Sequence, residues 1–335
     1  MKRRIAFIVL LGAAAAALAG VASGKSAAGS TGVGTVFLPN PVAELQNESL
    51  TDQKDADYAA LQPAYHNVTL TNLDGSGTLT GDWAQVVSET GNPAQSSTNT
   101  FTYHRNDDRF EQVMAYYWVT ESQKYIQSLG FGTGAFPPVN MKSQRLRINQ
   151  FGQDNSFATD HPVDELRFGK GGVDDAEDAE VILHEYGHAI HFSQNFSFDG
   201  DGGAISEGFG DYWAADFSNI VAPTPDPACV ADWDSVSYTS TVPHCLRRVD
   251  TNLHYPTDLS GEVHHDGQIW SRALWDIRAA LGHVKADTII LNGQFDFPGT
   301  TMTALAQSTV AAAQSLYGKN AAKAVTAAFA ARGIL

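Results

Sequence analysis

The chain has 335 residues, and its 21 Lys and Arg are outnumbered by 37 Asp and Glu, which gives a net charge of −16. This acidic balance argues against nucleic acid as a partner, because a phosphate backbone attracts basic surfaces. The length allows a large hydrophobic core, either in one domain or in two joined lobes.

The first 24 residues have the pattern of a secretory signal. Three basic residues follow Met1, residues 5–19 are apolar, and small residues continue to Gly24. We predict a cleaved signal peptide over residues 1–24 and an exported protein, extracellular or, in a Gram-negative cell, periplasmic. Its removal leaves 18 basic against 37 acidic residues, a net charge of −19. No later segment reaches the roughly 18 apolar residues of a spanning helix, so no membrane span is expected.

The remaining chain changes from strand-like to helical patterns. Residues 36–87 contain short β-rich runs, such as 67–71, and a turn at 74–77. An amphipathic helix is predicted from about Asp108 to Leu129, with Gly130 as its stop. After Pro223 the chain is rich in loops to about Asp258, and helices are predicted at 269–281, 301–316 and 321–331. We therefore expect an α+β fold with an N-terminal sheet-and-helix lobe, residues 25–195, and a mainly helical C-terminal lobe, residues 196–335.

The two cysteines lie in the loop-rich part of the chain, at Cys229 and Cys245. In an exported protein such a pair is expected to form a disulfide rather than two free thiols. Closing a loop of this length contributes about 3 kcal/mol if the geometry is unstrained. Catalysis by cysteine has little support.

The most informative motif runs from His184 to His188, with Glu185 between the two histidines. Residues four apart lie on one helix face, so both imidazoles can bind one metal ion, and zinc suits them. Glu185 can then take a proton from a water whose pKa the metal has lowered. The alternative is a surface helix with two incidental histidines, but apolar neighbours such as Ile182 predict a buried helix, in which both histidines need partners. Gly187 inside this helix suggests that another group approaches closely.

A catalytic zinc usually has three protein ligands, so the two histidines require a third. Glu207 is the best candidate, and Asp211 follows it by one helical turn. Asp211 is placed to accept the other N–H of a ligating histidine, which fixes the tautomer of that imidazole. The alternative is that both acids are helix caps or solvated charges.

These motifs resemble those of the thermolysin and fungalysin branch of the gluzincin zinc metallopeptidases. The resemblance rests on His-Glu-x-x-His followed about twenty residues later by Glu-x-x-x-Asp, and Tyr-Gly inside the first motif is closer to fungalysin. It covers residues 151–277 and implies a two-lobed zincin-like fold, one catalytic Zn²⁺ and hydrolysis of internal peptide bonds.

Three further stretches extend the resemblance towards a substrate site. Residues 262–277 resemble the helix whose leading histidine stabilises the transition state, which implies that role for His264, with His265 as the alternative. Residues 154–157 and 165–169 resemble the edge strand that pairs with the substrate backbone, which implies that Asn155 holds the peptide.

The resemblance of Leu246-Arg247, before Asp250, and of Val181 implies further contacts to the substrate. By resemblance, Arg247 binds a substrate carbonyl, and Val181 and Leu246 line the pocket after the scissile bond, where they would favour a bulky apolar residue.

The chain departs from the family in three respects. Only about 160 residues separate the signal from His184, so no separate pro-domain is expected. No tyrosine occurs in residues 196–199, where thermolysin has one that assists the oxyanion. Calcium ligands cannot be matched individually: Glu180 and the acidic run 174–178 are candidates for Ca²⁺ or, equally, favourable charges at a helix N-terminus.

The sequence thus predicts a secreted, monomeric zinc endopeptidase that acts on peptides or proteins. Two other classes stay open. A secreted binding module could keep the zinc fold without catalysis, although the loss of Glu185 or of a ligand would be its usual mark. A zinc hydrolase of a non-peptide substrate would share the metal site and differ in its cleft.

Overall fold

The computed structural model describes residues 29–87 and 92–335, so the predicted signal peptide lies outside the described residues. The N-terminal part contains two small sheets. Strands β1 (Ser30–Val36), β2 (His66–Leu73) and β4 (Thr100–Phe101) form one sheet in the order β2-β1-β4, in which β1 and β2 are antiparallel. The predicted run 67–71 lies inside β2, whereas β1 was not predicted apart from its last residue, Val36.

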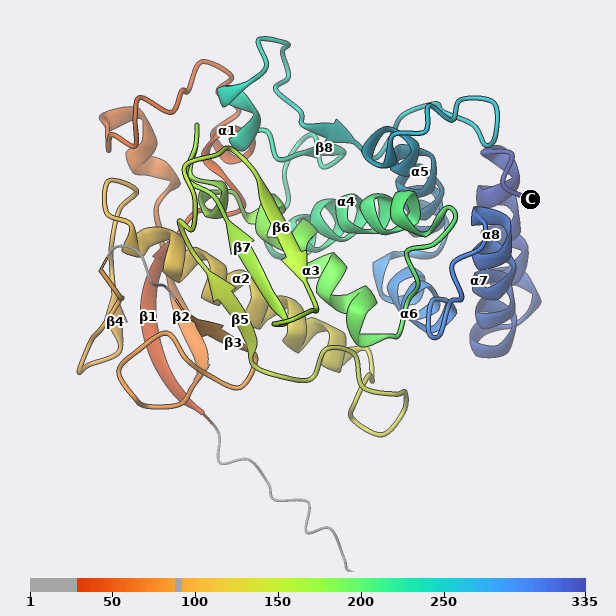
Figure 1. Ribbon diagram of the computed structural model, residues 1–335, viewed down its shortest axis with the longest axis horizontal. Helices are drawn as coiled ribbons and strands as arrows, with labels where there is room; N and C mark the ends of the chain where they lie inside the picture. Colours follow the sequence, from red (N-terminus) through yellow and green to blue (C-terminus); the bar gives the residue numbers. More distant parts are fainter. Residues whose placement is uncertain (1–28, 88–91) are drawn as a thin grey trace, which may run out of the picture.

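The second sheet has the strand order β3-β5-β7-β6. Its members are β3 (Ala84–Val86), β5 (Gln144–Arg147), β7 (Glu165–Phe168) and β6 (Ser156–Thr159). The first three strands run parallel, and β6 is antiparallel to β7 and forms the edge of the sheet. Figure 1 shows β6 and β7 next to the helix that carries the two histidines. Residue 155, which the sequence assigns to a substrate-binding edge strand, immediately precedes β6.

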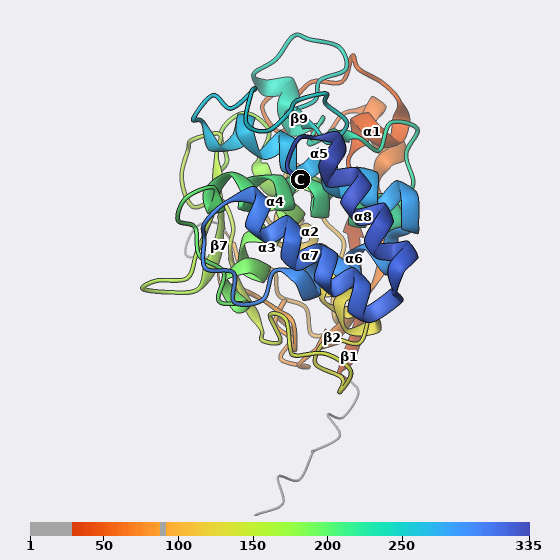
Figure 2. The same cartoon turned by 90° about the vertical axis from the view of Figure 1, so that its right-hand side faces the viewer.

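Helices make up most of the remainder. The longer ones are α2 (Arg109–Ser128), α3 (Ala179–Ser193), α4 (Gly202–Val221), α5 (Val263–Leu281), α6 (His283–Gly293), α7 (Met302–Tyr317) and α8 (Lys319–Ala331), and α1 (Pro41–Leu45) is short. In Figure 1 the sheets lie at one end of the molecule and α7 and α8 at the other, and Figure 2 shows α7 and α8 side by side. One cluster of buried apolar side chains contains members from both ends of the described chain, the first being Val36 and the last Ile334. The sheet region and the helical region therefore share a core.

The predicted helix 108–129 is confirmed as α2, and those at 301–316 and 321–331 as α7 and α8. The predicted start at 269 is wrong, because α5 begins at Val263: the carboxylate of Glu262 caps it by accepting from the backbone N–H of His264 and His265. Helix α6 was not predicted. No helix among the described residues is long and apolar enough to cross a membrane. The division of the chain at residue 195 stays a prediction.

Candidate metal centre and cleft

Helices α3 and α4 approach each other closely because glycines face each other at their contact. A Cβ atom added at Gly187 would lie 2.9 Å from the Cα of Gly210, and one added at Gly210 would lie 2.8 Å from His184 Nδ1. The group that was expected to approach Gly187 is therefore the backbone of α4. This short separation brings the carboxylate of Glu207 on α4 up to the histidines on α3.

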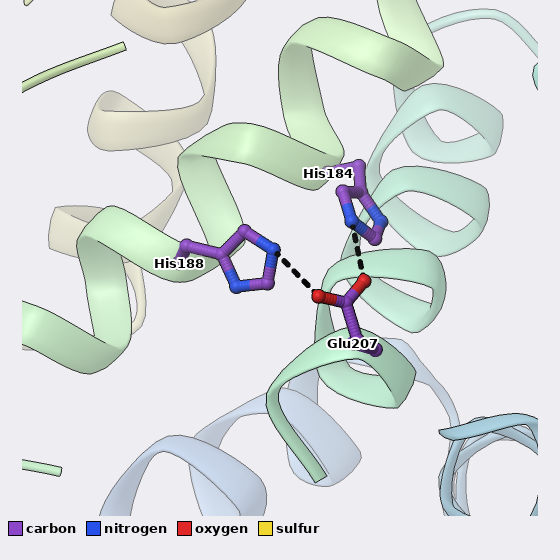
Figure 3. Close-up of side chains that lie close together, drawn as sticks. All are labelled: His184, His188 and Glu207. Carbon is purple, nitrogen blue, oxygen red and sulfur yellow. Dashed lines mark hydrogen bonds and ion pairs between the residues drawn. The ribbon is translucent and has the colours of Figure 1, made fainter. Parts of the chain in front are cut away.

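His184, His188 and Glu207 converge on one point, as Figure 3 shows. His184 Nε2 lies 3.1 Å from Glu207 Oε2, and His188 Nε2 lies 3.6 Å from Glu207 Oε1. One ligand atom from each residue falls within 4.8 Å of the others. Two imidazole nitrogens and a carboxylate oxygen are a donor set that suits zinc and leaves a further position open for water.

The outward-facing nitrogens of both histidines have their own partners. His184 Nδ1 lies 2.9 Å from Asp211 Oδ1, and His188 Nδ1 lies 2.8 Å from the hydroxyl of Ser206. The Ser206 hydroxyl also lies 2.9 Å from Nδ1 of the buried His191. With Nδ1 donating outward, Nε2 of each ring is the nitrogen directed at the shared point, where a metal ion would take the place of any proton on it.

The electrostatics of this cluster favour a positive charge. Burial lowers the pKa of His188 to about 4, so this ring is neutral. Burial also acts to lower the pKa of His184, but hydrogen bonds to Asp211 and Glu207 outweigh it and raise that pKa to about 10. The two carboxylates thus stabilise positive charge beside His184, and a divalent cation would supply it there. The residues present therefore fit a zinc ion.

Glu185 is buried beside the cluster and has an unpartnered oxygen. Its exposed fraction is 6 %, and its Oε2 has no hydrogen-bond partner. Burial raises the pKa of this carboxyl to about 7, against the opposing effect of His184. A carboxylate with a free oxygen and a pKa near neutrality can both accept and return a proton.

Two cavities adjoin this site. One has a volume of about 460 Å³ and is lined by Val181, Glu185, Leu246 and Arg247, among others. The other, of about 440 Å³, is lined by His188, Glu207 and the aromatic rings of Phe192 and Phe198. The residues that line both are Asn155, Ser156, His184, Glu185 and His264. The structure thus brings every residue to which the sequence assigns a substrate contact into one cleft around Glu185.

The structure distinguishes His264 from His265. His264 Nε2 lies 3.4 Å from Glu207 Oε2, and its Nδ1 is held by Glu262 at 2.6 Å. His265 instead has its Nδ1 3.1 Å from Asp266 Oδ1 and lines neither cavity. Only His264 is therefore in a position to contact a substrate at the candidate metal centre.

Arg247 has a protein partner that the sequence reasoning missed. Its Nε and Nη2 donate to the two oxygens of Asp211, each at 2.7 Å, and Asp211 in turn contacts His184. Ser206 and its link to His191 were also missed. Ser206 directly precedes Glu207 in the sequence, but no local pattern indicates that its side chain lies between two histidines of another helix.

The disulfide stabilises one wall of the cleft. Cys229 and Cys245 are joined, and strand β8 (Cys229–Val230) pairs with β9 (Arg247–Arg248). The bridge and the strand pair hold Val230 beside Leu246 and Arg247, all of which line the larger cavity.

The acidic residues considered for calcium mostly have protein partners. Glu177 accepts from Arg105 and from the indole of Trp233. Asp178 caps α3 by accepting from the N–H of Glu180, which fits a charge at a helix N-terminus. Glu180 accepts from Ser218 and from the N–H of Ala231. Residues 196–199 contain no tyrosine, and Phe198 among them lines the smaller cavity.

Comparison with known proteins supports the fold. No family model matches the chain. Gelatinase from Enterococcus faecalis (strain ATCC 700802 / V583) is 26% identical over 176 residues, which cover 48% of this chain. The chain spans only 34% of the length of that relative.

Among solved structures, the precursor of protealysin, a metalloproteinase from Serratia proteamaculans, matches with a TM-score of 0.57 at 16% identity. This match covers 90% of the chain and 99% of the solved one. The chain therefore has an α+β fold shared with a metalloproteinase, as predicted, and carries within it a candidate metal centre of two histidines and a glutamate.

Proposed function

We propose that this protein is a secreted, monomeric zinc-dependent endopeptidase of the gluzincin type. The observation that carries the proposal is the unpartnered, buried carboxylate of Glu185 next to the convergent His184, His188 and Glu207. The shared fold and the gelatinase relative support it. Calcium is not part of the proposal, because most of its candidate ligands are engaged by protein donors.

His184, His188 and Glu207 would hold the zinc ion. When bound, zinc would polarise the scissile carbonyl and lower the pKa of a water molecule. Asp211 and Ser206 keep Nε2 of the two histidines directed at the ion.

The chemistry of the chain itself begins at Glu185. Its free oxygen takes a proton from the attacking water and then passes it to the nitrogen of the leaving amine. His264 donates a hydrogen bond to the oxyanion that develops on the scissile carbonyl, a contribution whose loss often costs about a hundredfold in rate. Arg247 and Asn155 position the substrate backbone.

The cleft favours a peptide over a non-peptide substrate. Asn155 immediately precedes the edge strand β6 and lines both cavities beside Glu185. An extended peptide can add to such an edge and run past the candidate metal centre. A binding module without catalysis would not need a buried glutamate with a free oxygen at this position.

The substitution Glu185→Gln tests the proposal. It removes the base but keeps the shape of the side chain and all three ligands, so the variant should bind one zinc ion per chain while proteolysis falls by roughly 10²–10⁴-fold. Casein digestion and elemental analysis measure the two quantities. Glu121→Gln is the matched control, because Glu121 pairs with Lys124 on α2 away from both cavities. Parental activity in zinc-loaded Glu185→Gln would contradict the mechanism.

A further inference from the structure

Three aspartates line the larger cavity together. Asp154 precedes β6, Asp175 begins the short 3-10 helix Asp175–Glu177, and Asp234 begins another, Asp234–Ser237. One carboxylate oxygen from each lies within 4.8 Å of the others. Asp175 and Asp234 have exposed fractions of only 2 % and 4 %, whereas Asp154 is exposed.

Two of these carboxylates keep an unpartnered oxygen. Asp175 Oδ2 accepts from the hydroxyl of Ser156, and Asp234 Oδ2 accepts from that of Tyr238. Oδ1 of Asp175 and Oδ1 of Asp234 have no hydrogen-bond partner. Arg105, Arg145 and Arg247 form their ion pairs with other acidic residues.

Buried carboxylates that crowd one another without a cation are costly. Burial raises the pKa of Asp175 to about 7, and that of Asp154 to about 6, where Asp52 adds to the effect. A positive charge from outside the chain would remove this cost. The overall charge of −16 also attracts a cationic molecule to the surface.

The walls of the cavity indicate the shape of that cation. Val181, Val230, Ala231 and Leu246 line the same cavity as the three aspartates. Apolar walls next to carboxylates suit a side chain with an aliphatic stem and a charged head. A Ca²⁺ ion would take six to eight oxygen ligands and would gain nothing from apolar walls.

We propose that this cavity binds an arginine or lysine side chain of the substrate, at the residue that follows the scissile bond. The inference rests on the proposed peptidase function, and it takes the position from Val181 and Leu246, which the sequence resemblance assigns to the pocket after that bond. It replaces the bulky apolar preference that the resemblance suggested. Asp175 and Asp234 bind the charged head, and the exposed Asp154 completes the site.

Cleavage of matched peptides tests this specificity. Internally quenched peptides would differ only at the residue after the scissile bond, which is Arg, Lys, Leu or Glu. For the zinc-loaded parent we expect kcat/KM for the Arg and Lys peptides to exceed that for the Leu peptide by about tenfold or more, and the Glu peptide to be the poorest. In Asp175→Asn/Asp234→Asn the Arg-to-Leu ratio should fall by at least about tenfold.

Two further variants keep the test decisive. Asp154→Asn changes an exposed residue and should lower the same ratio even if the buried double variant does not fold. Asp160→Asn is the matched control, because Asp160 lies outside both cavities and its loss should leave the ratio unchanged.

Each remaining outcome has a distinct meaning. Equal cleavage of the Arg and Leu peptides would overturn the inference while the peptidase function stands. The same holds if the aspartate variants leave the Arg-to-Leu ratio of kcat/KM unaltered. If the parent cleaved the Arg and Leu peptides equally but bound Ca²⁺, and the aspartate variants did not bind it, the three aspartates would take a divalent cation instead, which also overturns the inference. If zinc-loaded parent cleaved no peptide, the proposed function itself would fail.

Discussion

At the scale of single residues, the candidate metal centre depends on groups that do not face the metal. Each histidine has one nitrogen at the shared point and the other on a fixed partner, Asp211 for His184 and Ser206 for His188. Asp211 was expected from its spacing after Glu207. Ser206 was not, because its role depends on where a neighbouring helix places His188.

We predict that Ser206→Ala weakens zinc binding by roughly 10–100-fold, because His188 Nδ1 loses the group that fixes its tautomer. Competition with a fluorescent zinc chelator measures the affinity. Ser271→Ala is the control: Ser271 is equally buried, but its hydroxyl donates only within its own helix, to the carbonyl of Gln268. Equal zinc affinity of the two variants would argue against the role of Ser206.

At the scale of helices and strands, periodicity predicted α2, α7 and α8, but it failed where other effects set the boundary. Helix α5 begins six residues before the predicted start because Glu262 caps it, and the polar residues of its first turns hide the apolar period. Strand β1 is poor in apolar residues, and its pairing with β2, more than thirty residues later, supplies what its composition does not.

The close contact between α3 and α4 leaves no room for a side chain at Gly210. Replacing glycine by alanine inside a helix normally stabilises it by about 1 kcal/mol. Gly210→Ala should do the reverse and cost about 1–3 kcal/mol, because its Cβ would lie 2.8 Å from His184 Nδ1. We expect a lower melting temperature and weaker zinc binding, measured by calorimetry and chelator competition.

Gly203→Ala provides the comparison on the same helix. Its added Cβ would lie 3.2 Å from the side chain of Val263, which is exposed and can move, and 4.0 Å from the backbone oxygen of Phe198, which is an ordinary contact. This variant should keep the zinc affinity of the parent and should not lower its melting temperature. If the two glycine variants behaved alike, close packing of α3 on α4 would not be what positions Glu207.

At the scale of the whole molecule, acidic groups determine how stability depends on pH. Burial raises the pKa of Asp174 to about 8 and those of Asp175 and Glu177 to about 7, all above the usual value near 4. Each group thus binds more protons in the folded than in the unfolded chain, from about pH 4 up to its folded pKa. Their contribution to the free energy of unfolding is complete below about pH 4. It is lost as the pH rises from there through the folded pKa values of about 7 to 8.

The zinc-free protein should therefore become less stable between about pH 6.5 and 8. Below that window the lowered pKa values of His188 and His191 act in the opposite direction, since these buried rings are neutral in the folded chain. Urea unfolding at several pH values gives the free energy of unfolding. Asp174→Asn should flatten the decline, and a stability that rises over this window would contradict the prediction.

The sequence by itself determined the parts of the site that lie within one helical turn or two. His184, Glu185 and His188 share a face because the helix repeats every 3.6 residues, and Asp211 follows Glu207 for the same reason. Only the tertiary structure decided which of His264 and His265 faces the candidate metal centre, since that depends on where the Glu262 cap starts α5. It also decided that Arg247 binds Asp211, and that Asp154, Asp175 and Asp234 meet in one cavity. Contacts between residues so far apart in the chain leave no periodic trace in the sequence, because packing of separate elements creates them.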